Sequence, residues 1–181
     1  IALLPPDVNR SSDRFTVEEN GIRFGLVAIK NIGRGFIQAM VREREKGGAF
    51  KSFQDFCERM YDCTDMNKRA VENLIRSGAF DSFGARRSQL IQVYESVGSV
   101  RRRNVEGQLD FFGMNTSSPE AASRVELPDV PEFTAVERMQ MERETTGLYL
   151  SGHPMGDYRA AAKRLGAVPI GEITEDFAGE E

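Results

Sequence analysis

A short glycine-containing turn, Gly33-Arg34-Gly35, carries the residues with the clearest chemical potential in this sequence. It lies in residues 32–39, where an apolar residue precedes Gly33 and an alanine follows Gly35 after three residues. Glycine permits positive φ and the close approach of another backbone. The first N–H groups of a helix that starts here are unpaired and carry the positive end of the helix dipole. The pattern fits a helix-hairpin-helix motif, whose helix start suits a DNA phosphate oxygen.

Two cations, Lys30 and Arg34, flank this turn. A phosphate contact carries no base information, so we expect binding that ignores DNA sequence. The predicted DNA contacts are therefore Lys30, Gly33, Arg34 and Gly35. The alternative interpretation is an ordinary corner between two helices, in which a glycine ends the first helix.

A second helix pair surrounds residues 77–84 and resembles a degenerate copy of the first. It lacks the Gly-x-Gly spacing, and the carboxylate of Asp81 would repel a phosphate. Its phenylalanines, Phe80 and Phe83, indicate packing. We therefore expect this pair mainly to support the fold and only secondarily to contact DNA. Arg86 and Arg87 are the side chains that could reach DNA.

A third candidate is the peptide Gln108-Leu109-Asp110-Phe111-Phe112, which follows a basic segment and precedes a Ser- and Pro-rich stretch. Adjacent aromatic side chains in a polar loop are costly to expose unless they bury somewhere. They could anchor a partner protein, with the glutamine fixing the register. They could also pin the loop to the core of this chain, and the residues alone favour that second interpretation.

Charge separates along the chain, whose overall net charge is only −4. Residues 21–103 carry 16 basic and 9 acidic side chains, whereas residues 104–181 carry 6 basic and 15 acidic ones. A basic segment of this kind is a candidate phosphate-binding surface. The same segregation is also compatible with an ordinary solvated surface.

Local patterns predict a mainly α fold that positions these residues. An extended lead-in and a β-hairpin with Asn20-Gly21 at its turn occupy residues 1–24, and this hairpin should be the only clear sheet. Helical spacing of apolar residues predicts a series of helices over residues 25–100, and the glycine turn with its degenerate copy makes this region a tandem helix-hairpin-helix bundle. A linker containing the aromatic peptide follows over residues 101–132, and a helical segment over residues 133–181.

Capping signals mark two of these helices: Ser52 with Asp55, and Thr134 with Glu137, whose helix should end at Gly147. A last helix should begin near Pro154. Its inward face is predicted to hold Met155, Tyr158, Ala162 and Leu165.

Several functional classes are excluded or unsupported. No stretch approaches the roughly 20 apolar residues of a membrane-spanning helix. Cys57, Cys63 and His153 are too few for a zinc cluster, and no hydrolase triad is present, so we assign no catalytic and no metal residue. The chain starts at Ile1, which indicates a piece of something longer, and a reducing cytoplasm is the default location.

Four strings in this sequence resemble the alpha subunit of bacterial replicative DNA polymerase III, a C-family polymerase. They are Leu4-Pro5-Pro6-Asp7-Val8-Asn9, Phe24-Gly25-Leu26 with residues 29–33, Ser77-Gly78-Ala79-Phe80-Asp81, and residues 146–154. The resemblance implies a helix-hairpin-helix module that holds duplex DNA, and a sliding-clamp-binding peptide at Gln108 to Phe112, which reverses the preference above. It also implies that an OB-fold domain would follow and that the catalytic aspartates lie upstream of residue 1.

The function expected from this resemblance is duplex binding and clamp docking within a replicative polymerase. The partners would be duplex DNA, the sliding clamp, the remaining polymerase domains and other holoenzyme subunits, with no membrane, in the cytoplasm at the bacterial nucleoid. No cofactor is expected in this chain, although the parent polymerase would use Mg²⁺, and the chain alone should be catalytically inactive. Two rivals are a helix-hairpin-helix repair enzyme such as a glycosylase, and a protein-docking module whose helix pairs do not contact DNA.

Overall fold

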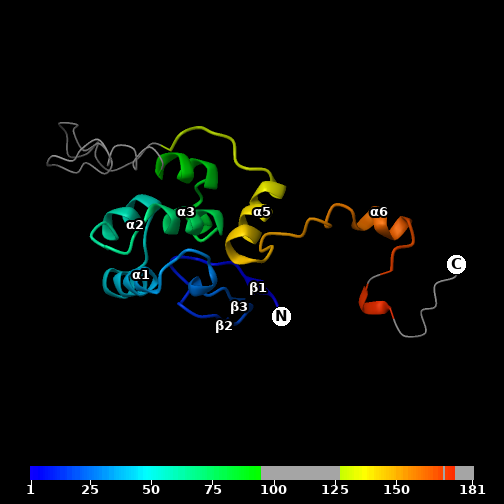
Figure 1. Ribbon diagram of the computed structural model, residues 1–181, viewed down its shortest axis with the longest axis horizontal. Coiled ribbons are helices and arrows are strands. Elements are labelled where there is room, and N and C mark those ends of the chain that lie inside the picture. Colours follow the sequence, from blue (N-terminus) through cyan, green and yellow to red (C-terminus); the bar gives the residue numbers. More distant parts are fainter. Residues whose placement is uncertain (95–126, 169, 174–181) are drawn as a thin grey trace.

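A small sheet opens the chain in the computed structural model, which describes residues 1–94, 127–168 and 170–173 (Figure 1). Strands β2 (Thr16–Glu18) and β3 (Gly21–Arg23) form the predicted antiparallel hairpin, with Val17 opposite Ile22. The lead-in adds a strand that the sequence did not predict, because β1 (Leu3–Leu4) pairs in parallel with β3. The hairpin thus lies in a three-stranded sheet of order β1-β3-β2.

Helices make up most of the remaining body and confirm the mainly α fold (Figure 1). A 3-10 turn, η1 (Leu26–Ala28), precedes α1 (Arg34–Gly47), and α2 (Phe53–Arg59) and α3 (Lys68–Arg76) follow. A further helix begins at Arg87 and is described as far as Tyr94; we call it the Arg87 helix. We call the η1–α1 pair the first hairpin and the pair of α3 with the Arg87 helix the second hairpin.

Side chains cap the starts of α2, which the sequence marks, and of α3, for which no cap was predicted. The Ser52 hydroxyl accepts a hydrogen bond from the Asp55 amide at the start of α2, and Asn67 does the same for Ala70 at the start of α3. The return contact of Asp55 goes to the amide of Lys51 rather than to that of Ser52. These contacts satisfy amides that would otherwise be unpaired at a helix start.

The core lies where α1, α2 and α3 meet, and it is rich in phenylalanine. Phe36, Phe56 and Phe80 are each no more than 1% exposed, and the rings of Phe56 and Phe80 meet edge to face at a centroid distance of 4.9 Å. Edge-to-face contacts of this kind add to the gain from burial. The apolar face predicted for α3 is fully buried, namely Ala70, Val71, Leu74 and Ile75.

Helix α5 (Ala135–Thr146) packs on α3, far from it in sequence. Its start shows the predicted capping box between Thr134 and Glu137, and it ends at Gly147 in the left-handed conformation, as expected. Among the helices in the described ranges, none has the length and apolar content that a membrane crossing requires.

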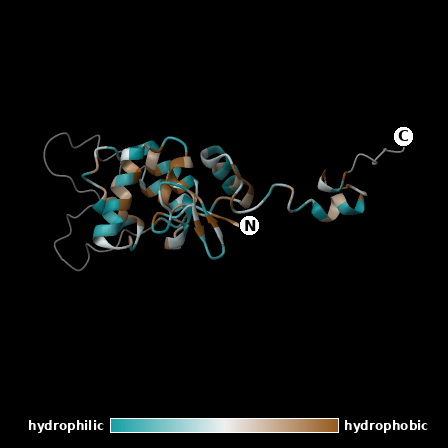
Figure 2. Ribbon diagram, turned by 90° about the horizontal axis from the view of Figure 1, so that it is seen from below, coloured by the Kyte–Doolittle hydropathy of each residue, from teal (hydrophilic) through white to brown (hydrophobic). Residues whose placement is uncertain are grey.

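The last helix differs from its prediction. Helix α6 (Arg159–Arg164) begins later than expected and lies apart from the helical body in two perpendicular views (Figures 1 and 2). Met155, Tyr158 and Leu165, which were expected to face inward, are 52%, 60% and 86% exposed. Their spacing is helical, but no other described segment lies against α6 to bury them.

Candidate nucleic-acid interface

The turn of the first hairpin joins η1 to α1 through residues 29–33. Gly33 is the N-cap residue of α1 with φ −69° and ψ 143°, and Gly35 lies in the first helical turn. Neither glycine therefore adopts the positive φ that their presence suggested. Asn31 adopts it instead, at φ 60°, and asparagine is one of the few residues that tolerate this conformation.

The start of α1 is exposed and offers free donors. No side chain caps it, and the first amide that donates within the helix is that of Ile37, which bonds to the Gly33 carbonyl at 3.1 Å. The amides of Arg34, Gly35 and Phe36 have no acceptor within the described residues. Gly33, Arg34 and Gly35 are all exposed, so an anion can approach these donors from solvent.

The two glycines matter for different reasons. A side chain added at Gly33 would meet no atom within 4 Å, so its position faces open space. A Cβ at Gly35 would lie 2.1 Å from Asp65 Oδ2, so the carboxylate of Asp65 rests against the first turn of α1. The close approach that Gly35 permits in this structure is therefore to an acidic side chain.

Two distant elements hold the turn in place at Lys30. The Lys30 amide donates to the Thr145 carbonyl at the end of α5 at 2.8 Å, and Asn73 Nδ2 on α3 donates to the Lys30 carbonyl at 2.6 Å. The side chains of Lys30 and Arg34 are exposed and make no ion pair with any residue of the described ranges. Both cations that were predicted as phosphate contacts are therefore accessible beside the free amides.

Arg87, in the second hairpin, lies where a DNA contact is not possible, which corrects its assignment. Its side chain is 4% exposed and forms ion pairs with Asp81 at 2.6 Å and Glu142 at 2.9 Å. Burial lowers the pKa of this guanidinium, but hydrogen bonds and charge from both carboxylates raise it by more. Asp81 was expected to repel a phosphate; its role in the structure is to neutralise a buried arginine.

The start of the Arg87 helix is occupied by the chain itself. The carboxylate of Glu132 accepts hydrogen bonds from the amides of Arg87 at 2.9 Å and Ser88 at 3.2 Å. Burial raises the pKa of Glu132, but these bonds and one from the Phe133 amide lower it by more, so its pKa lies below the ordinary 4.5. Arg86 pairs with Asp129 at 3.2 Å and donates to the Val130 carbonyl, leaving 46% of its side chain exposed.

Glu142 is a second carboxylate that sequence reasoning missed. It is 1% exposed and, besides pairing with Arg87, accepts bonds from the amides of Leu150 and Ser151 at 2.9 and 2.8 Å. The capping box at Thr134 predicts where α5 begins, and so that Glu142 lies near its end. No neighbouring residue, however, indicates that this position is buried.

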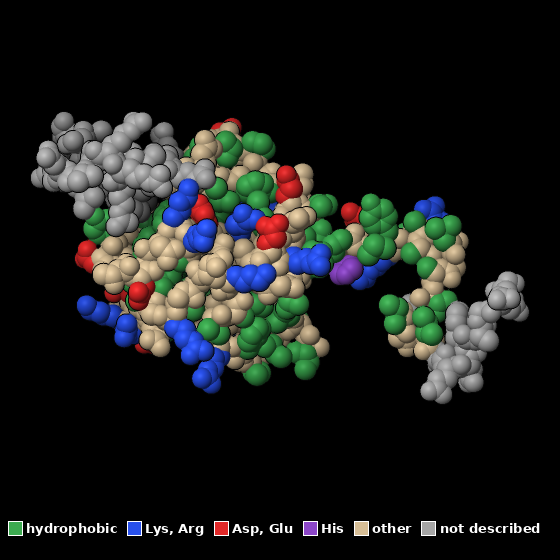
Figure 3. Space-filling view, in the orientation of Figure 1, with side chains coloured by type: hydrophobic (Ala, Val, Ile, Leu, Met, Phe, Trp, Pro, Cys, Tyr) green, Lys and Arg blue, Asp and Glu red, His purple; other side chains and the backbone are tan. Residues whose placement is uncertain are grey.

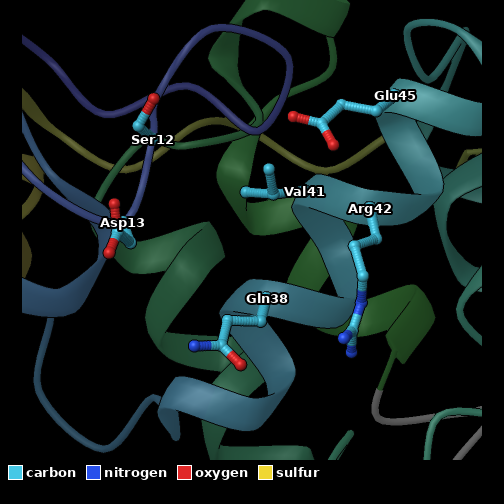
Figure 4. A pocket seen from close by; sticks show the side chains of 6 residues that line it. All are labelled: Ser12, Asp13, Gln38, Val41, Arg42 and Glu45. Atoms are coloured by element: carbon cyan, nitrogen blue, oxygen red, sulfur yellow. The ribbon is translucent and has the colours of Figure 1, made fainter.

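The peptide from Gln108 to Phe112 lies outside the described residues. In the part of the chain that the structure describes, no three His, Cys, Asp or Glu side chains gather as metal ligands. An open hollow between the Ser12–Asp13 loop and α1 is lined by side chains of both charges (Figure 4). On the face seen in Figure 3, Lys and Arg side chains spread over the helical body with acidic ones among them.

Known proteins match this chain at two levels: a family model covers the hairpin region, and longer relatives match nearly the whole chain. Residues 1–90 match the family described as "Helix-hairpin-helix motif". The chain is 41% identical over 163 residues to DNA polymerase III subunit alpha of Vibrio cholerae serotype O1, which covers 87% of this chain and 14% of that protein. It is 36% identical over 178 residues to the subunit of Chlamydia pneumoniae, covering 96% and 14%, and 34% identical over 193 residues to that of Pseudomonas aeruginosa, covering 96% and 16%.

The chain spans only about one seventh of the length of these relatives, because the matches cover 14% to 16% of each. Over that segment the match runs through nearly all of this sequence, including the described helices on both sides of residues 95–126. The chain belongs to the bacterial DNA polymerase III alpha subunit family and corresponds to a helix-hairpin-helix segment of it.

Proposed function

We propose that the first hairpin binds the backbone of duplex DNA without sequence preference, as part of a bacterial replicative polymerase. The observation that carries this proposal is the open start of α1, where three amides lack an acceptor among the described residues and Gly33 leaves the approach clear. The helix-hairpin-helix match and the polymerase relatives supply the kind of anion, a phosphate of the DNA backbone.

The expected contacts are electrostatic and directed at phosphate. Backbone amides and the side chains of Lys30 and Arg34 can bind phosphate oxygens whatever the base, so they fix position and not sequence. Since the turn is held at Lys30 by α3 and α5, the donors are oriented before DNA arrives. Preorganised donors lose less conformational freedom on binding.

A second part of the proposal is clamp docking through Gln108, Leu109, Asp110, Phe111 and Phe112. Its support is the Gln-x-x-aromatic pattern and its place after the basic segment. A tether to a ring on DNA would make the hairpin's DNA contact intramolecular, so it would act at a high effective concentration. The module would then work at the bacterial nucleoid in the cytoplasm, while polymerisation and its Mg²⁺ belong to other parts of the polymerase.

A duplex titration across salt tests the DNA contact. If roughly two to four phosphates are engaged, the logarithm of the binding constant should fall with the logarithm of salt at a slope of about −2 to −4. Gly33→Leu places a side chain in the open approach and should abolish most of this binding. Its control is Gly171→Leu, which also faces open space but lies beyond α6.

The outcome distinguishes the proposal from its main rival. If Gly33→Leu retains the circular dichroism and the duplex affinity of the unmodified chain, the helix pairs only pack, and the chain is a protein-docking module. Clamp docking is tested separately by capture on the sliding clamp. Gln108→Ala and Phe112→Ala should each lose capture, whereas Gln140→Ala on the exposed side of α5 should not.

A further inference from the structure

Helix α3 lies beside the turn of the first hairpin, and two contacts fix its position there. Just before α3 begins, the Asp65 carboxylate rests against Gly35, within 2.1 Å of where a Cβ would be. One turn or more into α3, Asn73 Nδ2 donates to the Lys30 carbonyl at 2.6 Å. The segment just before α3 and the side of α3 that carries Asn73 therefore both lie against the turn that offers the free amides.

Arg69 lies between these two contacts. Within α3 it precedes Asn73 by four residues, and residues four apart lie one above the other on a helix, whereas Asp65 lies before the N-cap of α3 at Asn67. Arg69 therefore shares with Asn73 the face of α3 that is turned toward Lys30. The opposite face of α3 is buried in the core, whereas Arg69 is exposed.

The charge of Arg69 is also uncommitted, unlike that of its neighbours on α3. Lys68 pairs with Glu72 at 3.2 Å, and Arg76 pairs with Glu144 of α5. Arg69 has no hydrogen bond or ion pair with any residue in the described ranges. An exposed guanidinium without a carboxylate partner is available to a phosphate, which it can bind with two parallel hydrogen bonds.

We propose that Arg69 is a third cation of the DNA-binding surface, joining Lys30 and Arg34 so that the surface spans two helices, α1 and α3. This inference rests on the proposed function, because it names a further contact for the same partner. The carboxylate of Asp65 lies within the same surface and opposes a phosphate there. Ionic screening acts over about 10 Å at 0.1 M salt, so a charge in contact with the first turn of α1 is felt at the site.

The two residues therefore predict effects of opposite sign in one duplex titration with the 181-residue chain. Arg69→Gln should weaken binding by about 3-fold to 10-fold on duplexes of different sequence, and should reduce the size of the salt slope by about 1. Asp65→Asn should strengthen binding by about 2-fold to 5-fold at low salt. Helical circular dichroism and the urea midpoint should stay unchanged for both, because both side chains are exposed.

The matched control is Lys46→Gln, which removes one exposed cation from the other end of α1, about 18 Å from Arg34 along the helix axis. It should change the affinity by less than about 2-fold. If Arg69→Gln behaves like this control while Gly33→Leu abolishes binding, the role of Arg69 is wrong and the proposed function stands. If the unmodified chain shows no salt-dependent duplex binding, both fail.

Discussion

The two hairpins of this molecule differ in what lies against the start of their second helix. In the first hairpin, α1 begins at a bare glycine and its leading amides find no acceptor among the described residues. In the second, Glu132 accepts from the amides of Arg87 and Ser88. The first hairpin therefore offers donors to an external anion, whereas the second satisfies its donors with an anion of its own chain.

This difference shows that the start of a hairpin's second helix does not always leave its amides free for an external anion. Both helix starts have the same need for negative charge, which follows from the unpaired amides and the helix dipole. What differs is whether a carboxylate of the chain accepts hydrogen bonds from those amides: Glu132 does so in the second hairpin, whereas Asp65 rests against the first turn of α1 with no hydrogen bond from the described amides of that helix. In the second hairpin, Glu132 accepts hydrogen bonds from the helix amides, while Asp81 and Glu142 pair with the buried side chain of Arg87.

The largest effect should come from the carboxylate at the centre of that network. Glu142→Ala leaves Arg87 buried with Asp81 as its only carboxylate partner and removes the acceptor for the Leu150 and Ser151 amides. Loss of one partner from a buried ion pair is expected to lower the free energy of unfolding by about 3 kcal/mol. Urea denaturation followed by circular dichroism measures it.

A neighbouring glutamate on α5 gives the control for this prediction. Glu144 is 51% exposed in its pair with Arg76, so Glu144→Gln should cost at most about 1 kcal/mol. Equal losses for Glu142→Ala and Glu144→Gln would mean that the second hairpin does not depend on its buried charges.

A smaller effect is expected at Glu132, and it should depend on pH. Its pKa is lower in the folded chain than in the unfolded one, so it stabilises the fold above the ordinary carboxyl value and loses that contribution as pH falls through the folded pKa. Glu132→Gln should therefore cost about 1 kcal/mol at neutral pH and nothing in acid. Urea midpoints across pH measure this difference.

Glu19 provides a comparison, because it is exposed in the turn between β2 and β3. Glu19→Gln should change the urea midpoint little at neutral pH, because this side chain is exposed and makes no ion pair with a described residue. If Glu132→Gln costs no more than this control at neutral pH, or costs the same at every pH, its carboxylate is not what satisfies the start of the Arg87 helix.

The smallest effect sharpens the comparison from the DNA side. Arg86 is partly exposed but already engaged by Asp129 and the Val130 carbonyl, whereas Arg34 is free of ion pairs within the described ranges. Arg86→Gln should therefore weaken duplex binding by less than about 2-fold, and Arg34→Gln by about 3-fold to 10-fold. Equal losses in a salt titration would make the second hairpin a DNA contact too.

Local signals in the sequence predicted those features that local forces decide. The β2–β3 turn at Asn20-Gly21, the cap at Ser52 and the capping box at Thr134 all depend on residues within a few positions of one another. The open start of α1 follows in the same way from the glycine at position 33.

Features that depend on distant partners were not accessible from sequence. Arg87 is buried because a carboxylate 55 residues away reaches it, and no pattern near Arg87 indicates Glu142. The apolar spacing in α6 predicted an inward face, but such a face requires another element to pack against. In the turn of the first hairpin, a positive φ was expected at a glycine and is found at Asn31 instead.

One peptide hydrogen bond has a consequence for the smallest piece of this chain that could work alone. The Lys30 amide donates to the Thr145 carbonyl, across 115 positions of sequence. The helix-hairpin-helix match ends at residue 90. A chain cut there would lose the Thr145 carbonyl, which accepts the hydrogen bond from the Lys30 amide and so holds the turn of the first hairpin from the α5 side. A fragment meant to bind DNA alone must therefore include α5, because the segment that supports the turn extends beyond the residues of the recognisable motif.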